Sequence, residues 1–311
     1  NFQFISRTAK LIDKYYLRKK CESIFQISEL YFPLFVDFTV KSCSTATFNP
    51  IPKPEKTMLT LLSCAKTMSE KASADVPFTT VPQFRETARD NALQLAQLTP
   101  EELSKILGTN AKIAVENKIR YLDFSVEGKT GTAALLAYTG IVFKRLNPSD
   151  FSDDDFRYAQ DHLRLTSFLY GYLRPLDEIL PYRLEGNVRL PEYGGLTMFE
   201  FWRGRLTDLF IADIKATGGV LCNLASDEMR GLFDWKRVER EVKVVTPEFR
   251  VWKDGKLKTI VVYTKMMRGE MTRYILKNRI ENAADLTAFH SDEGFAYAPE
   301  LSSPSKPVFT V

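Results

Sequence analysis

Arginine and tyrosine side chains alternate in one segment of the sequence, between His162 and Leu190. The arginines are Arg164, Arg174, Arg183 and Arg189, and the tyrosines are Tyr170, Tyr172 and Tyr182. Guanidinium groups bind phosphate in a bidentate manner and tyrosine rings stack on bases, so this segment predicts nucleic-acid binding. The alternative is a structural network in which the same arginines pair with Asp177, Glu178 and Glu185. The composition of the segment favours neither interpretation.

A second group of polar residues lies in predicted turns or at the ends of predicted strands, where catalytic groups are often found. Its members are Lys66, Arg183, Glu185, Asp227, Glu228 and Lys265. They are candidates for an enzyme that acts on a nucleotide or a nucleic acid. A single closed pocket that brings Lys66, Glu185 and Asp227 together favours such chemistry, whereas an open basic trough favours DNA binding.

Several familiar catalytic and metal-binding motifs are absent from the sequence. Gly128-Lys129-Thr130 lacks the glycine five positions earlier that a phosphate-binding P-loop needs, because position 123 is an aspartate. Neither His162 nor His290 follows a Glu-x-x-His pattern, and no G-x-S-x-G sequence occurs. Two histidines and four scattered cysteines predict neither a zinc site nor a disulfide framework. We therefore expect no metal and no cofactor.

Positive charge is concentrated at the beginning of the chain. The 311 residues are 44% hydrophobic and 26% charged, with a net charge of +4, which is typical of a globular protein. Residues 1–57 carry nine basic and five acidic side chains, which accounts for the whole excess. An argument for nucleic-acid binding must therefore rest on the clustering of charge. No apolar run is long enough to cross a membrane.

We interpret residues 1–57 as a leader. They begin with Asn1, precede the first methionine, Met58, and end in the proline-rich stretch 49–54, which is typical of a linker. We expect Met58 to be the native start and the leader to be translated upstream sequence. The alternative is a small extra element.

The spacing of apolar residues predicts one α+β domain over residues 58–311, with a mixed β-sheet flanked by helices. Buried strands are expected at 58–63 and 220–224, and helices at 82–98, 100–107, 111–122 and 269–280. Ser152 is an expected helix cap, and Thr197 forms an expected capping box with Glu200. Asp254-Gly255, between alternating segments at 250–252 and 258–263, predicts a β-hairpin.

Gly108, Thr109 and Asn110 separate two of the predicted helices. Glycine and asparagine tolerate the left-handed conformation that a tight hairpin needs. Backbone N–H groups at the start of the second helix, which bears Lys112, suit a phosphate. These residues predict a helix-hairpin-helix-like DNA contact, with an ordinary helix connection as the alternative.

Five motifs follow one another in a fixed order. They are S-C-A-K-T at 63–67, L-Y-G-Y-L-R-P-L-D at 169–177, P-Y-R-L-E at 181–185, N-L-A-S at 223–226 with Glu228, and Lys265 with Arg268-Gly269. Over residues 58–311 the sequence thereby resembles the bacterial peroxide stress protein YaaA family. Cys64 replaces a usual proline, Met229 a usual tyrosine, and Met266-Met267 a usual Lys-Ala pair.

The resemblance implies a cytosolic protein that limits free iron and protects DNA and protein from peroxide. It also implies binding of duplex and branched DNA through a positive cleft and a helix-hairpin-helix element, and it brings no established reaction. We expect DNA as the partner, room for a small-molecule ligand, no membrane contact and a monomer. The expected DNA contacts are Gly108, Asn110, Lys112, Arg164, Arg174, Arg189, Arg268 and Arg273.

Two further expectations concern single residues. Arg174 is the better phosphate candidate because Pro175 next to it indicates a turn, whereas Arg183 is expected to be structural or to lie in a pocket. Lys66 could lower the pKa of the Cys64 thiol and make it sensitive to peroxide. We favour the alternative, in which Cys64 simply replaces proline at a strand end.

Overall fold

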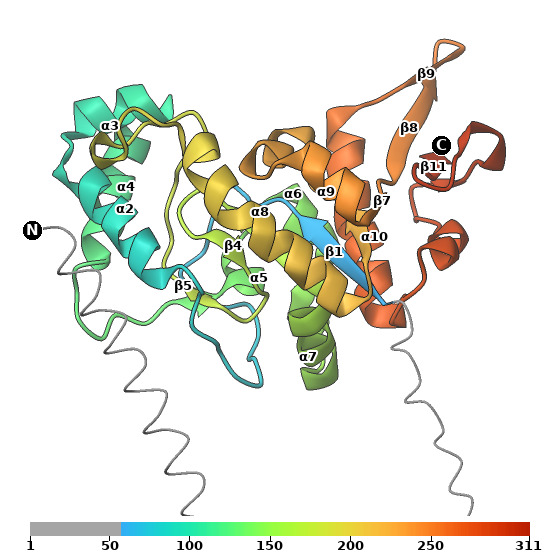
Figure 1. Ribbon diagram of the computed structural model, residues 1–311, viewed down its shortest axis with the longest axis horizontal. Helices are drawn as coiled ribbons and strands as arrows, with labels where there is room; N and C mark the ends of the chain where they lie inside the picture. Colours follow the sequence, from blue (N-terminus) through green and yellow to red (C-terminus); the bar gives the residue numbers. More distant parts are fainter. Residues whose placement is uncertain (1–56) are drawn as a thin grey trace, which may run out of the picture. The chain divides into compact units, whose positions relative to one another are not determined.

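A five-stranded mixed β-sheet lies at the centre of residues 57–311, the part of the chain that the computed structural model describes (Figure 1). Its middle strand, β1 (Met58–Leu62), runs parallel to β3 (Leu163–Ser167) on one side and to β6 (Val220–Asn223) on the other. β4 (Gly171–Leu173) pairs with β3 antiparallel, and β7 (Lys243–Val245) pairs with β6 parallel. The mixed sheet predicted from the sequence is confirmed.

The three parallel strands β1, β3 and β6 are buried at every residue, as expected for strands covered on both faces. Both predicted strands are confirmed, and each ends one residue earlier than expected. α8 (Met198–Thr217) crosses in front of the sheet and contacts β1, β4 and β6 (Figure 1). α7 (Asp153–His162) and α10 (Val261–Asn278) also pack against β1.

Side-chain caps fix where α7 and α8 begin. The Ser152 hydroxyl accepts a hydrogen bond from the Asp155 amide at 3.2 Å, and the Asp155 carboxylate accepts one from the Ser152 amide at 3.0 Å. Thr197 and Glu200 form the same reciprocal pair at 3.2 and 2.8 Å. These hydrogen bonds confirm both predicted caps. Each cap satisfies backbone donors that the start of a helix leaves unpaired.

The remaining elements surround the sheet. The other helices are α2 (Arg85–Gln97), α3 (Pro100–Leu107), α4 (Ala111–Asp123), α5 (Ala134–Ala137), α6 (Ile141–Leu146) and α9 (Trp235–Glu241). Short 3₁₀ helices are η1 (Pro148–Asp150), η2 (Pro191–Tyr193), η3 (Asp227–Leu232), η4 (Ala283–Ala288) and η5 (Pro299–Leu301). Two smaller sheets pair β2 (Thr132–Ala133) with β5 (Glu178–Ile179), and order β10 (Ala296–Tyr297), β11 (Val308–Thr310), β8 (Glu248–Lys253) and β9 (Lys256–Lys258).

The direction of strand order reverses at β1. The chain passes from β1 to β3 on one side of the sheet and later returns to β6 on the other side. In open sheets of this kind, ligands bind in the crevice outside the carboxyl ends of the strands at such a reversal. The loops that follow β1 and β6 therefore lie where a site is expected.

The β8–β9 hairpin is confirmed, but its second strand is shorter than predicted. β9 ends at Lys258, and α10 begins at Val261, eight residues before the predicted helix start. Val261 and Val262 are exposed in the first turn, whereas Met266, Met267 and other residues further along α10 are buried. Packing of the helix outweighs the strand preference of its β-branched first residues.

The helices α3 and α4 pack against each other and are joined by Gly108, Thr109 and Asn110. Gly108 ends α3 in the left-handed conformation, with φ of 57°, and the Asn110 side chain accepts a hydrogen bond from the Ile113 amide. The two helices and their tight connection are as predicted. The interpretation of this connection as a DNA-binding helix-hairpin-helix element stays a prediction.

Gly269 lets α10 approach α6 closely, and its replacement tests this packing. A Cβ at position 269 would lie 2.1 Å from the Val142 carbonyl oxygen. We predict that Gly269→Ala lowers the free energy of unfolding by about 1–3 kcal/mol, because overpacking forces backbone shifts. Gly204 in α8 has no atom within 4 Å of such a Cβ. Gly204→Ala is therefore the matched control and should stabilise by about 0.5–1 kcal/mol. Urea denaturation of both variants measures the difference, and an unchanged stability of Gly269→Ala would contradict the close packing.

Candidate functional site

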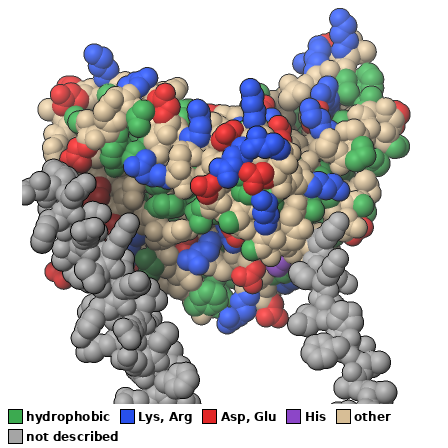
Figure 2. Space-filling model, in the orientation of Figure 1, with side chains coloured by type: hydrophobic (Ala, Val, Ile, Leu, Met, Phe, Trp, Pro, Cys, Tyr) green, Lys and Arg blue, Asp and Glu red, His purple; other side chains and the backbone are tan. Residues whose placement is uncertain are grey.

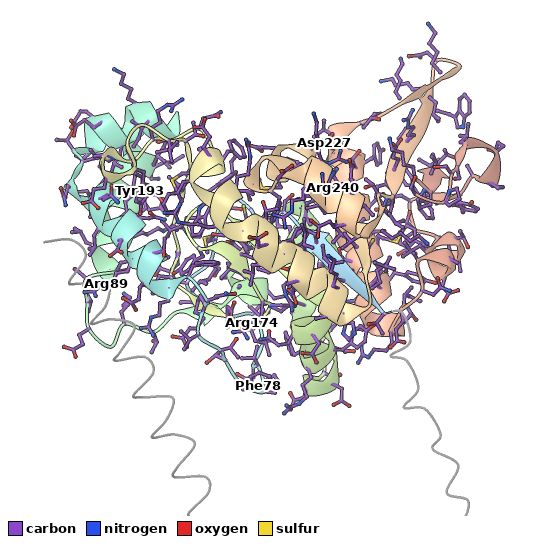
Figure 3. All side chains as sticks on the ribbon, viewed as in Figure 1. Phe78, Arg89, Arg174, Tyr193, Asp227 and Arg240 are labelled. Atoms are coloured by element: carbon purple, nitrogen blue, oxygen red, sulfur yellow. The ribbon has the colours of Figure 1, made fainter. Side chains whose placement is uncertain are left out.

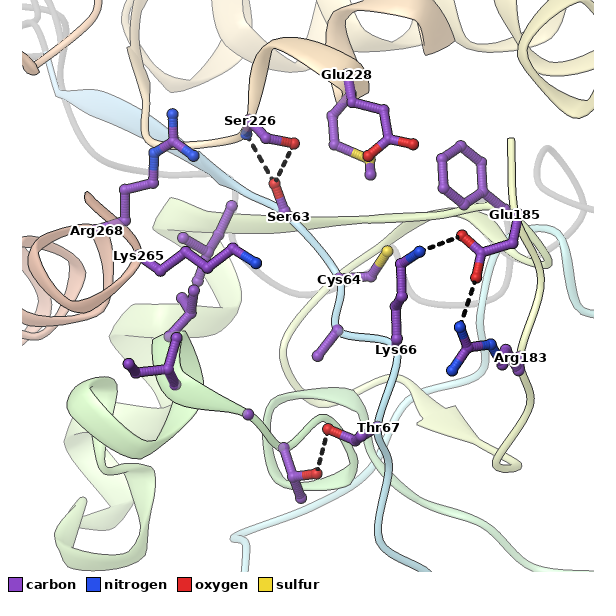
Figure 4. Close-up of a pocket in the computed structure, with 18 of the residues that line it drawn as sticks. Ser63, Cys64, Lys66, Thr67, Arg183, Glu185, Ser226, Glu228, Lys265 and Arg268 are labelled. Atoms are coloured by element: carbon purple, nitrogen blue, oxygen red, sulfur yellow. Dashed lines mark hydrogen bonds and ion pairs between the residues drawn. The ribbon is translucent and has the colours of Figure 1, made fainter. Parts of the chain in front are cut away.

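A cavity of about 360 Å³ lies at the carboxyl ends of β1 and β6, and we call it the strand-end pocket (Figure 4). It brings together five of the six residues proposed from the sequence as catalytic, together with one proposed as a DNA contact. These are Lys66, Arg183, Glu185, Glu228 and Lys265, with Arg268 as the sixth. The residues come from four separate parts of the sequence, and the fold alone makes them neighbours.

Ser63 and Ser226 join the loops that follow β1 and β6. The Ser226 amide donates a hydrogen bond to the Ser63 hydroxyl at 2.8 Å, and the two hydroxyl oxygens lie 3.3 Å apart (Figure 4). The sequence analysis did not select either serine as a site residue. A usable signal was present, because Ser63 is the last residue of one predicted buried strand and Ser226 comes two residues after the other.

Glu185 bridges two cations on one wall of the pocket. Its carboxylate contacts the Lys66 ammonium at 2.8 Å and the Arg183 guanidinium at 3.0 Å (Figure 4). The Tyr121 hydroxyl on α4 donates to the Arg183 carbonyl oxygen, which fixes the backbone of this segment. Arg183 thus lies in the pocket, as expected, and its Nε has no acceptor among residues 57–311.

Lys265 and Arg268 lie one helical turn apart on α10 and reach the opposite wall (Figure 4). Neither forms an ion pair within the described part of the chain. The Asp227 carboxylate, which pairs with Arg230, acts only to raise the pKa of the Arg268 guanidinium. Burial lowers the pKa of the Arg268 guanidinium from its ordinary value. This direction means that the desolvation of Arg268 is only partly offset by neighbouring charges. An anionic ligand would supply the missing compensation.

Asp227 is the candidate that the structure leaves outside the pocket. Its side chain is 86% exposed and contacts Arg230 at 3.2 Å (Figure 3). Glu228, the next residue of η3, lines the pocket instead. Successive side chains of a 3₁₀ turn point in different directions, so only one of two adjacent carboxylates can face the cavity.

Apolar and aromatic side chains complete the lining, among them Phe168, Leu184, Leu224 and Met229. The Tyr182 hydroxyl lies 2.6 Å from the Ser167 hydroxyl and 2.7 Å from that of Tyr138. Burial raises the pKa of Tyr182 well above its ordinary value, so its ring is a neutral part of the wall.

Cys64 lines the pocket without the properties of a reactive thiolate. Burial raises the pKa of its thiol to about 12, and the carboxylates of Glu228 and Glu185 act in the same direction. The thiol is therefore protonated at neutral pH. This geometry favours the interpretation of Cys64 as a replacement for proline at a strand end.

The arginines of the 162–190 segment are largely engaged in ion pairs. Arg164 is buried and donates two hydrogen bonds, of 2.7 and 3.1 Å, to the Asp213 carboxylate. Arg174 contacts Asp177, whose side chain is only 1% exposed, at 2.8 Å (Figure 3). Arg174 was expected to be the better phosphate contact, but it holds a buried carboxylate. For these two residues the geometry favours the structural network.

The other expected DNA contacts are spread over the surface. Arg189 donates to the Gly195 carbonyl oxygen and lies 3.8 Å from the Glu200 carboxylate, and Arg273 contacts Asp150 at 2.7 Å. Gly108, Asn110 and Lys112 are exposed at the α3–α4 connection. Apart from Arg268 in the strand-end pocket, these residues do not converge on one site.

The structure defines an α+β protein with a cavity at the carboxyl ends of strands in a mixed sheet. No helix of residues 57–311 is long and apolar enough to cross a membrane. In the same residues no group of three His, Cys, Asp or Glu side chains is placed to hold a metal ion.

Comparison with known proteins identifies the family. Residues 58–301 match the family described as peroxide stress protein YaaA. A UPF0246 protein of Bacteroides fragilis is 66% identical over 253 residues, which are 81% of this chain and 98% of that protein. UPF0246 proteins of Bacteroides thetaiotaomicron and Porphyromonas gingivalis are 64% and 48% identical, over 81% and 82% of this chain and 98% and 100% of their own lengths. This chain belongs to the peroxide stress protein YaaA family.

Residues 1–56, which make up nearly all of the predicted leader, lie outside the described residues, so that prediction stays open.

Replacement of Arg164 separates a structural role from a DNA contact. Arg164→Ala leaves the Asp213 carboxylate without its cation, so we predict a loss of stability on the order of 3–5 kcal/mol. Arg164→Lys should recover only part of this loss because lysine cannot form the two-pronged contact. Arg240→Ala, at an exposed arginine of α9, is the control and should change stability by less than about 1 kcal/mol. Urea denaturation checks all three variants. A fully stable Arg164→Ala protein with weakened DNA binding would contradict the structural assignment.

A pair of carboxylates beside Arg145 predicts a pH dependence of stability. Arg145 on α6 contacts Glu270 of α10 at 3.0 Å and Glu293 at 2.6 Å. Burial, and then the nearby Glu293 carboxylate, raise the pKa of Glu270 from 4.5 to about 7. The folded chain therefore retains a proton that the unfolded chain has already released. Between pH 4.5 and 7 this group makes stability fall as the pH rises. We predict a shallower decline for Glu270→Gln in denaturation curves across this range. An unchanged pH profile would contradict the assignment.

Proposed function

We propose that this protein acts in the peroxide stress response by binding a phosphate-bearing ligand, a nucleotide or the end of a nucleic acid, in the strand-end pocket. The observation that carries the proposal is the pair Lys265 and Arg268, two cations that have no ion-pair partner among the described residues. A phosphate placed between them would replace the hydration that Arg268 loses on burial. The hydroxyls of Ser63 and Ser226 supply hydrogen-bond donors beside these cations.

The size and the apolar wall of the pocket support a nucleotide as the ligand class. A cavity of about 360 Å³ falls in the range of about 300–1,000 Å³ that small-molecule sites occupy. Phe168, Leu184 and Met229 offer an apolar surface for a base or sugar, while the charged residues lie on the rest of the lining.

The same residues support an enzymatic step on that ligand. Glu185 is held by Lys66 and Arg183, so its role is to position these two cations. Glu228 forms no ion pair within residues 57–311 and is the candidate proton acceptor. The cations would stabilise negative charge that develops on a phosphate during transfer or hydrolysis.

DNA binding at the α3–α4 connection is the second candidate. The left-handed Gly108 and the exposed Lys112 support it. The Asn110 side chain accepts from the Ile113 amide, and the amides of Ala111 and Lys112 at the start of α4 remain available to a phosphate. We also propose that the protein limits free iron, lies in the cytoplasm and is a monomer. None of these properties is assigned to particular side chains.

Calorimetric titration of the full chain tests the pocket. We predict that nucleoside monophosphates bind, and that Lys265→Gln and Arg268→Gln each weaken this binding about tenfold. Lys236→Gln, at an exposed lysine of α9 outside the pocket, is the charge-matched control and should bind like the wild type. Each pocket variant should also reduce the dependence of affinity on salt, since one fewer cation meets the phosphate. Equal binding by all three variants, or no binding by the wild type, would sink the proposal.

A further inference from the structure

The β8–β9 hairpin projects away from the rest of the described chain (Figure 1). Its turn residues Asp254 and Gly255 both adopt left-handed conformations, with φ of 56° and 69°, which suits a two-residue hairpin loop. Lysine and arginine side chains gather along it (Figure 2). The hairpin also exposes 55% of Trp252, the largest side chain that it carries.

The charges at the end of the hairpin are not arranged to stabilise it. Lys253 and Lys256 are directly opposite each other on the paired strands, a like-charge arrangement that is destabilising. Neither has a carboxylate partner within residues 57–311, whereas the neighbouring Lys258 contacts Asp254 at 2.9 Å. Trp252 lies opposite Leu257, and more than half of its surface remains in solvent. The fold therefore gains little from these three side chains.

We propose that the β8–β9 hairpin is a contact for single-stranded nucleic acid, in which Trp252 stacks on an unpaired base and Lys253 and Lys256 bind the adjacent phosphates. Aromatic stacking and basic side chains are the two components of sequence-tolerant strand binding. The positive lysine side chains complement the negative phosphate backbone. A bound phosphate would in turn offset the repulsion between Lys253 and Lys256.

The alternation of the strands favours a single strand over a duplex. Trp252 and Leu257 share one face of the hairpin, and Lys253 and Lys256 share the other. A flexible single strand can cross the narrow edge of a two-stranded ribbon and use both faces. A duplex keeps its bases stacked inside and cannot present one to Trp252.

The hairpin leads directly into α10, the helix that carries two residues of the strand-end pocket. α10 begins three residues after β9, and its first turns carry Lys265 and Arg268 to the pocket. The inference rests on the nucleic-acid part of the proposed function, because both concern a ligand with a phosphate backbone and α10 connects the two places. Binding at the hairpin does not require chemistry in the pocket.

Tryptophan fluorescence of the full chain tests the inference with oligothymidylate as the probe. The chain has three tryptophans, of which Trp202 is buried and Trp235 is partly buried, so Trp252 is the one most open to a stacked base. We expect oligothymidylate to quench the emission. Trp252→Ala should abolish the quenching and weaken binding about tenfold, and Trp252→Phe should keep most of the affinity. Trp235→Phe is the matched control and should leave both quenching and affinity unchanged.

The double variant Lys253→Gln/Lys256→Gln provides the second readout. Loss of two phosphate contacts should reduce the slope of log affinity against log salt by about 1.4. Equal affinity of the wild type and Trp252→Ala for oligothymidylate would overturn the inference. It would also be overturned if the wild-type chain bound anionic phosphatidylserine vesicles or a polyglutamate peptide more tightly than oligothymidylate, with the Trp252 emission reporting that binding. If mononucleotides bind the pocket while oligothymidylate does not bind, the inference fails and the proposed function stands. If oligothymidylate binds through Trp252 and no mononucleotide binds, the inference stands and the pocket proposal fails.

Discussion

The buried central strand β1 is the constraint on which the rest of the structure depends. All five of its residues are buried, and the strand pairs with β3 on one edge and with β6 on the other. The loop that follows it therefore emerges between the carboxyl ends of its two parallel neighbours. The residues that follow, from Ser63 to Thr67, consequently line the strand-end pocket. The hydrogen bond between Ser226 and Ser63 then ties the loop after β6 to the loop after β1. The order of the strands therefore places the loops that form the pocket, and the charged side chains only complete its lining.

The charged residues of the pocket fall into two functional sets. Glu185 holds Lys66 and Arg183 in a closed ion-pair arrangement, which gives that wall a fixed geometry. Lys265 and Arg268, on α10, have no such partner among the described residues and are available to an anion. The close approach of α6 and α10 at Gly269 keeps the second set in place. A preformed wall facing two open cations is an arrangement suited to holding a phosphate.

The sequence was sufficient to predict two of the five strands of the central sheet, two helix caps and the charged residues that line the pocket. Continuous apolar runs identified β1 and β6, and the capping patterns at Ser152 and Thr197 identified two helix starts. It could not separate Asp227 from Glu228, because the direction of a side chain in a 3₁₀ turn depends on the backbone. It also could not tell that Arg164 and Arg174 are paired. Asp213, the partner of Arg164, lies 49 residues away in the sequence and becomes its neighbour only when α8 packs on the sheet.

The central claim is that the strand-end pocket carries the function of this protein in the peroxide stress response. Survival of bacteria after hydrogen peroxide exposure, in a host that lacks its own copy and expresses this chain, measures it most directly. The account predicts that a Lys265→Gln/Arg268→Gln chain, folded and present at normal abundance, fails to protect the cells, while Lys236→Gln protects them fully. Full protection by the pocket variant, with loss of protection by Lys112→Gln instead, would contradict the account and move the function to the α3–α4 connection.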